Sequence, residues 1–158
     1  MKHQNYQDLS KKNLGKLPVW NLKDLYHSPN STLLKNDISN LRSITKKFEK
    51  KYNNKIVKLN SKQLYKSITE LEEIDTKIDK IMSYAHLLVA EDGNNEKNKI
   101  FYQQMQEQIT NIASSIVFFS LQLNLITDNN LKKLISNDIL KIYKNWIINT
   151  RKFKPYQL

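Results

Sequence analysis

The chain has 158 residues, and its 26 basic against 15 acidic residues give a formal charge of +11. Two residues are glycine, three are proline and none is cysteine, which excludes a disulfide framework and a thiolate metal site. The length is enough for one domain with its own core. Hairpins need Gly-containing turns at regular intervals, and Asp92-Gly93 is the single strong pair, so the composition predicts an all-α protein.

The first sixteen residues are polar and contain no apolar stretch of the kind that a secretory signal requires. The most apolar run, residues 109–126, is interrupted by asparagine, serine and glutamine and is short for a membrane span. We therefore expect a cytoplasmic protein with no membrane partner. Residues 1–16 are expected to be a polar tail and residues 17–158 one helical domain.

The positive charge has two interpretations. A basic chain can bind nucleic acid, which would make its binding sensitive to salt. However, only Arg42 and Arg151 are arginines, the lysines are distributed along polar helix faces, and frequent Lys, Asn and Ile indicate AT-rich codon usage. The dense cluster at residues 46–51 fits a solvated helix end, where lysines complement the helix dipole. We therefore expect no nucleic-acid partner.

Apolar residues at spacings of three and four predict long helices. The second and third of these are expected to pack as a long antiparallel pair, with additional shorter helices, in an incomplete bundle. The first spans residues 32–53, is capped by Asn30 or Ser31 and ends at Asn53 or Asn54. A short connection at residues 55–60, rich in β-branched side chains, favours a briefly extended conformation. The second begins at Ser61 as its cap and is expected to be exposed on one side until Asp79 and enclosed from Ile81 to Ala90. The apolar stripe of the second helix comprises Leu64, Ile68, Leu71, Ile74, Ile78, Ile81, Ala85 and Leu88.

The turn at residues 91–95 leads into a third helix that starts near Glu96. Its stripe comprises Ile100, Phe101, Met105, Ile109, Ile112, Ile116 and Phe119. The final part is apolar on most of its circumference, and such a helix needs burial on most sides. A small bundle cannot supply this, so the chain is expected either to form oligomers or to be part of something larger.

Two shorter helices are expected after the third. Thr127 caps one at residues 128–136, and Asn137 or Asp138 begins another, with Leu140, Tyr143, Trp146 and Ile147 on one side. Pro155 ends any helix near the C-terminus. Phe153, Tyr156 and Leu158 then have no evident site of burial within the chain.

The sequence provides no catalytic constellation. The histidines His3, His27 and His86 share no helix at a metal-ligand spacing, and HLLVAE at His86 is not the zinc pattern His-Glu-x-x-His. Two glycines exclude a Gly-rich phosphate loop. The carboxylates Glu70, Glu72 and Glu73 are expected to form an exposed helix face, with no acid/base role. We therefore assign no catalytic, cofactor-binding or metal residue to this chain.

Several segments nevertheless resemble the oligoendopeptidase F type of zinc metallopeptidases, relatives of thimet oligopeptidase. Residues 17–26, LPVWNLKDLY, are similar to the opening L-P-x-W-D/N-L-x-D-L-Y of that family. Residues 82–92, MSYAHLLVAED, are similar to its SYA-x-L-L/Y-x-A-x-D segment. The segments that match the following family pieces, in the same order, are residues 101–107, 118–124 and 146–158.

The resemblance implies that the incomplete bundle is part of a larger helical peptidase. The chain would be the N-terminal helical portion of such an enzyme, part of the wall of the channel in which short peptides are cut. The family's His-Glu-x-x-His helix and zinc belong to a downstream catalytic domain, which this chain lacks, so the chain alone is expected to be inactive. A missing or separately encoded catalytic domain is the expected partner. The alternative is an independent helical module for protein interaction. Within the opening segment, Asn21 is expected to cap a short turn that directs Trp20, Leu22, Leu25 and Tyr26 onto the helices.

Overall fold

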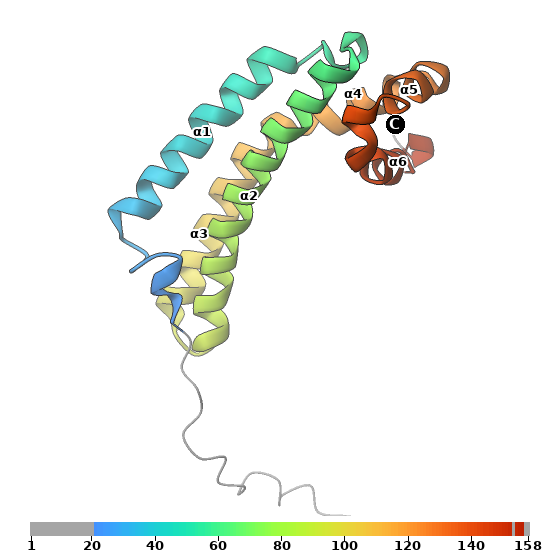
Figure 1. Cartoon of the computed structure of the whole chain (residues 1–158). Coiled ribbons are helices and arrows are strands. Elements are labelled where there is room, and N and C mark those ends of the chain that lie inside the picture. The colour runs from blue at the N-terminus through green and yellow to red at the C-terminus, as the bar shows by residue number, and fades with distance from the viewer. Residues whose placement is uncertain (1–20, 153, 157–158) are drawn as a thin grey trace, which may run out of the picture.

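The computed structural model describes residues 21–152 and 154–156, and every regular element in these residues is a helix, as the composition predicted. Three long helices lie side by side: α1 (Thr32–Tyr52), α2 (Ser61–Glu91) and α3 (Glu96–Ala113). Shorter helices pack at one end of these three, and we call residues 118–156 the cap (Figure 1). The α-helices of the cap are α4 (Phe118–Leu125), α5 (Asp128–Ile135) and α6 (Lys144–Arg151). The 3₁₀ turns are η2 (Leu22–Asp24), η3 (Ile56–Lys58), η4 (Ser114–Ile116), η5 (Asp138–Tyr143) and η6 (Lys154–Tyr156).

The ends of α1 follow from its flanking residues, as predicted. The Ser31 hydroxyl accepts a hydrogen bond from the Leu34 amide and caps the first turn. At the other end Asn54 adopts a left-handed conformation with φ of 62°, which asparagine tolerates better than most residues.

The connection between α1 and α2 corrects two expectations. Residues Ile56–Lys58 form a 3₁₀ turn rather than an extended segment, and the turn buries Ile56 completely in the core. The cap of α2 is Asn60 rather than Ser61, because Asn60 and Gln63 form a reciprocal capping box. Ser61 is then the first helical residue, and its hydroxyl donates to the Leu134 carbonyl of the cap at 3.2 Å.

The helices α2 and α3 form the predicted antiparallel pair, joined by a turn in which Asn95 caps α3 (Figure 1). The Asn98 side chain of α3 donates to the Leu88 carbonyl of α2 at 2.9 Å, which closes this end of the pair. The second half of α2 is less enclosed than expected: Ile81, Tyr84 and Ala85 are buried, whereas Ser83, His86 and Ala90 are exposed.

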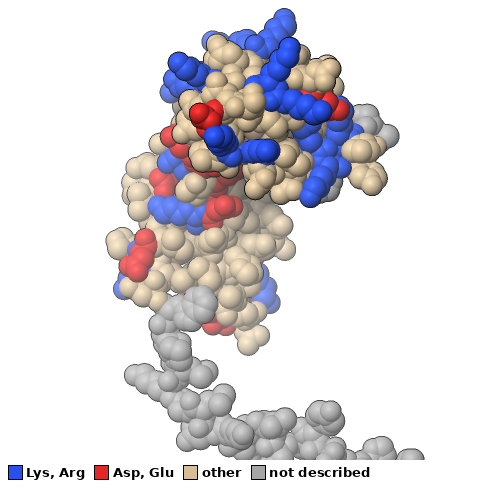
Figure 2. Space-filling view, turned by 45° about the vertical axis from the view of Figure 1, so that its right-hand side comes forward, with Lys and Arg blue, Asp and Glu red and all other residues tan. Residues whose placement is uncertain are grey.

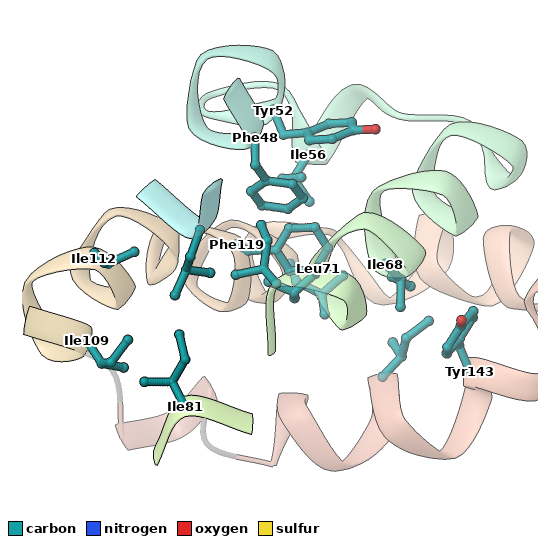
Figure 3. Packing of buried hydrophobic residues seen from close by; sticks show 14 of the residues in the cluster. Phe48, Tyr52, Ile56, Ile68, Leu71, Ile81, Ile109, Ile112, Phe119 and Tyr143 are labelled. Carbon is teal, nitrogen blue, oxygen red and sulfur yellow. The ribbon is translucent and has the colours of Figure 1, made fainter. Parts of the chain in front are cut away.

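The chain remains helical from α3 into α4 but tightens to a 3₁₀ turn at η4. The Ser114 and Ser115 hydroxyls donate to the carbonyls of Asn111 and Ile112, three residues earlier. Such bonds compete with the regular helical ladder and bend helices. Further along the chain, the ring of Phe119 lies 5.8 Å from that of Phe48 of α1 (Figure 3).

The cap contacts the C-terminal end of α1 and the N-terminal end of α2 through residues that are far apart in sequence. The rings of Tyr65 and Tyr143 lie 5.6 Å apart, and the Gln122 amide donates to the Asn53 side chain at 2.7 Å. Arg151 of α6 is 9% exposed at its side chain; its guanidinium donates to the Leu123 carbonyl of α4 and to Asp128 of α5, both at 2.7 Å. Arg151 therefore joins all three cap helices.

Replacing Arg151 by alanine is expected to lower the free energy of unfolding by about 1.5–3 kcal/mol, the usual range for charged hydrogen bonds. Arg151→Lys should restore only part of this loss, since an ammonium cannot make both bonds in the fork geometry of a guanidinium. The neighbouring exposed Lys152→Ala is the matched control. Urea denaturation followed by circular dichroism measures all three, and equal stabilities of Arg151→Ala and Lys152→Ala would disprove the joining role.

Candidate interaction surfaces

Two of the three histidines lie in the described residues. His27 and His86 are both exposed, and the nearest aromatic ring to His86 is that of Tyr102, 6.1 Å away. Residues 21–152 and 154–156 contain no group of three His, Asp or Glu side chains placed to hold a metal ion. His3, the third histidine, lies outside the described residues. The donor set present therefore does not fit the zinc site of the family that the sequence resembles.

Of the carboxylates Glu70, Glu72 and Glu73, the last two are exposed, as expected, and Glu70 is half-buried. Glu70 forms an ion pair with Lys51 of α1 at 2.5 Å. Glu72 accepts a hydrogen bond from the Tyr143 hydroxyl at 2.5 Å. Burial, followed by this bond and the Glu72 charge, raises the pKa of Tyr143 to about 12. Two of the three carboxylates thus fasten α1 and the cap to α2.

The segment before α1 is held by a polar cluster that sequence analysis did not identify. Tyr26 is 1% exposed, and its hydroxyl donates to Asp37 of α1 at 2.8 Å. Lys80 of α2 donates to the same carboxylate oxygen at 3.1 Å and lies 4.5 Å from the centre of the Tyr26 ring. The ring also contacts Tyr84 edge to face at 5.1 Å. This cluster fixes the segment to both helices.

The charges in this cluster stabilise one another. Burial alone would raise the pKa of Asp37, but the hydrogen bonds from Tyr26 and Lys80 and the charges of Lys80 and Lys77 outweigh it and lower the pKa. Burial, the bond to Asp37 and the charge of Asp37 all raise the pKa of Tyr26. The neighbouring Leu22 and Leu25 are partly buried against the core, and Asn21 caps the turn as predicted. Trp20 lies outside the described residues.

Two grooves run along α1. The one between α1 and α2, about 580 Å³ in volume, has Ile44, Phe48 and Ile74 on its floor and charged side chains of both signs on its rim. The one between α1 and α3, about 460 Å³ in volume, is crossed by a hydrogen bond of 3.4 Å from Arg42 to Gln108. Both are open surface depressions between packed helices.

The helix α4 has two apolar faces, and the described part of the chain buries only one. Phe119 and Leu123 are at most 1% exposed, whereas Val117, Leu121 and Leu125 are 52%, 44% and 68% exposed. We call these last three residues the α4 stripe; their spacing of four places them on one side of the helix. Three buried side-chain atoms also lack a hydrogen-bond partner among the described residues, Gln122 Oε1 and both polar atoms of Asn124, and all three belong to α4.

The basic residues gather at the end of the molecule that carries the cap. Residues 46–66 and 114–156 contain 15 basic and three acidic residues, a net charge of +12, whereas residues 67–113 carry a net charge of −5. The contacts of Ser61 with Leu134 and of Tyr65 with Tyr143 bring the two basic segments together. Figure 2 shows lysine and arginine side chains crowded over this end. The sequence did not show this gathering, because the spacing of lysines along helix faces cannot reveal that two distant segments meet.

Comparison of the chain with models of protein families, with curated proteins and with solved structures finds no match. In the described part of the chain, no single helix is long and apolar enough to cross a membrane. Two helical segments, Glu96–Leu125 and Asp128–Ile135, are together long and apolar enough for a membrane span, but the chain bends by 102° between them. The α4 stripe, the basic end of the molecule and the resemblance in sequence are therefore the basis for a functional proposal.

Proposed function

We propose that this chain is the N-terminal, non-catalytic helical part of an oligoendopeptidase F-like zinc metallopeptidase and contributes to the wall of the channel that holds short peptides. The catalytic residues and the zinc belong to a partner polypeptide, since the described residues offer no set of metal ligands. In this proposal the chain acts by shape and by docking, and it has no peptidase activity alone.

The observation that carries the proposal is the α4 stripe. Leu121 and Leu125 fall in or next to residues 118–124, one of the segments that resemble the family, and both are exposed. Covering the exposed part of each side chain would provide about half of the roughly 1.5–3 kcal/mol that full burial of a leucine contributes. Exposed aliphatic side chains at helical spacing, beside a buried face on the same helix, are typical of a surface that another polypeptide covers.

The Tyr26 cluster supports the same proposal from the other end of the chain. The family-like segment at residues 17–26 contributes Tyr26 to the core and Leu22 and Leu25 to its edge. The residues that carry the resemblance thus have structural roles in this bundle. Such roles are what a supporting domain, rather than a catalytic one, requires.

An independent helical interaction module is the second candidate, and the quality of the packing favours it. Each of the helices α1, α2 and α3 has a side-chain hydrogen bond that caps its N-terminus. A core of buried residues runs through all three helices. A module of this kind would fold cooperatively alone and have a defined oligomeric state. Analytical ultracentrifugation combined with thermal unfolding distinguishes it from a part that needs its partner to remain soluble.

The decisive experiment mixes this chain with the product of an adjacent reading frame that encodes His-Glu-x-x-His, in the presence of zinc and a quenched fluorescent peptide. We expect no hydrolysis by this chain, little by the partner, and strong hydrolysis by the mixture. The double variant Leu121→Ser/Leu125→Ser should abolish the gain, and Leu33→Ser, which changes an equally exposed leucine on α1, should not. Hydrolysis by the partner that is unaffected by this chain would refute the proposal.

A further inference from the structure

The α4 stripe lies in a neutral segment within the most basic part of the molecule. Residues 114–127 contain no charged side chain, whereas the two basic segments that meet at this end carry a net charge of +12. A partner must therefore satisfy two requirements here. It must cover three aliphatic side chains, and it must present negative charge around them.

The geometry of the stripe narrows the form of that partner. Val117, Leu121 and Leu125 follow the i, i+4, i+8 row of one helix, a row that spans about 12 Å at 1.5 Å per residue. Rows of this kind pack against the corresponding rows of a second helix. A helix that lies along α4 would bury all three side chains at once.

We propose that the α4 stripe binds an acidic amphipathic helix of a partner protein, with the apolar face of that helix on Leu121 and its carboxylates toward the lysines of residues 46–66 and 114–156. This inference rests on the proposed function in one respect, namely that the acidic helix belongs to the catalytic partner. The apolar and basic character of the surface does not depend on which protein supplies the helix. It deepens the proposed function by specifying the chemical nature of the docking surface.

Other occupants fit the surface less well. Duplex nucleic acid would neutralise the lysines but has no aliphatic surface for Leu121 and Leu125, and it is recognised mainly through its phosphates. A second copy of this chain would bring another basic cap against this one, and like charges oppose such an association. An acidic amphipathic helix meets both requirements of the surface.

The test uses a dye-labelled synthetic peptide with a leucine row at i, i+4 spacing and glutamates on the remaining faces, titrated with the full chain by fluorescence anisotropy. We expect binding that weakens with rising salt. Replacing the peptide's leucines by serine, or its glutamates by lysine, should each weaken binding at least about tenfold, equal to 1.4 kcal/mol. Leu121→Ser/Leu125→Ser in the protein should do the same, with Leu33→Ser as the matched control.

Two outcomes would overturn the inference. The first is equal binding of the leucine and serine peptides, or equal binding by the wild type and the Leu121→Ser/Leu125→Ser variant. The second is tighter binding of a 20-base-pair DNA duplex than of the peptide, which would assign the surface to nucleic acid. Circular dichroism confirms that the variants fold, as exposed positions permit. Peptide binding without complementation of peptidase activity would refute the proposed function and leave this inference intact.

Discussion

The variant Phe119→Ala is expected to lose about 3–5 kcal/mol of unfolding free energy, the usual cost of truncating a buried aromatic side chain. Phe119 is 1% exposed, and its ring lies 5.8 Å from Phe48 of α1 and 6.4 Å from Trp146 of α6. Phe119 therefore contributes to the packing of the cap against α1, beside Phe48 (Figure 3). Because small domains are stable by only about 5–15 kcal/mol, this loss should bring the protein close to unfolding at 37 °C.

Chemical denaturation of Phe119→Ala should be compared with that of Leu121→Ala, two residues further along α4. Leu121 is 44% exposed, so its truncation removes little buried area and should change stability by less than about 1 kcal/mol. If both variants lose the same stability, the distinction between the buried and exposed faces of α4 is incorrect. Fluorescence of Trp146 in a Trp20→Phe background would also show whether the cap detaches before the long helices unfold.

The long helices could be predicted from the sequence because their determinants are local. Side chains three and four residues apart share a helix face wherever the chain is helical, so the apolar stripes identify the buried faces directly. Caps are also local: Ser31, Asn95 and Thr127 each accept a bond from an amide two or three residues further on. The Asn60–Gln63 capping box was missed although its signal is local, because Ser61 offered a competing cap.

Contacts between distant segments could not be predicted in the same way. Nothing in the periodicity of α1 or α2 shows that Asp37 and Lys80 meet at the Tyr26 hydroxyl. The gathering of lysines at the cap likewise depends on how residues 46–66 and 114–156 pack together. Both features arise from the tertiary arrangement, which the spacing of residues along one helix does not contain.

The candidate docking surface was predictable in part. The excess of apolar residues at 109–126 indicated that some would remain uncovered, and Val117, Leu121 and Leu125 are exposed. The sequence did not show which residues these would be, because the choice depends on how α4 packs against α1, η3 and α6.

The second large effect is expected for Tyr26→Ala, which should also cost about 3–5 kcal/mol. The substitution removes a buried ring from between α1 and α2, and it removes the hydroxyl donor to Asp37. The segment at residues 21–30 would then lose its main attachment to the bundle. Hydrogen exchange measured by mass spectrometry should show faster exchange at the N-terminal end of α1, in addition to the loss of global stability in urea.

The control Tyr26→Phe keeps the ring and removes only the hydroxyl. At pH 7 it should cost about 1.5 kcal/mol, since the lost bond is made to an ionised carboxylate. The pKa of Asp37 is lower in the folded state than in the unfolded state. The ionised carboxylate therefore stabilises the fold at a pH above its unfolded-state pKa. This stabilisation is lost as the pH falls through its folded-state pKa. The difference between wild type and Tyr26→Phe should therefore shrink steadily below about pH 4. A difference independent of pH between 7 and 2 would show that the Tyr26 hydroxyl does not stabilise the ionised form of Asp37, and no difference at pH 7 would show that the bond contributes nothing to stability.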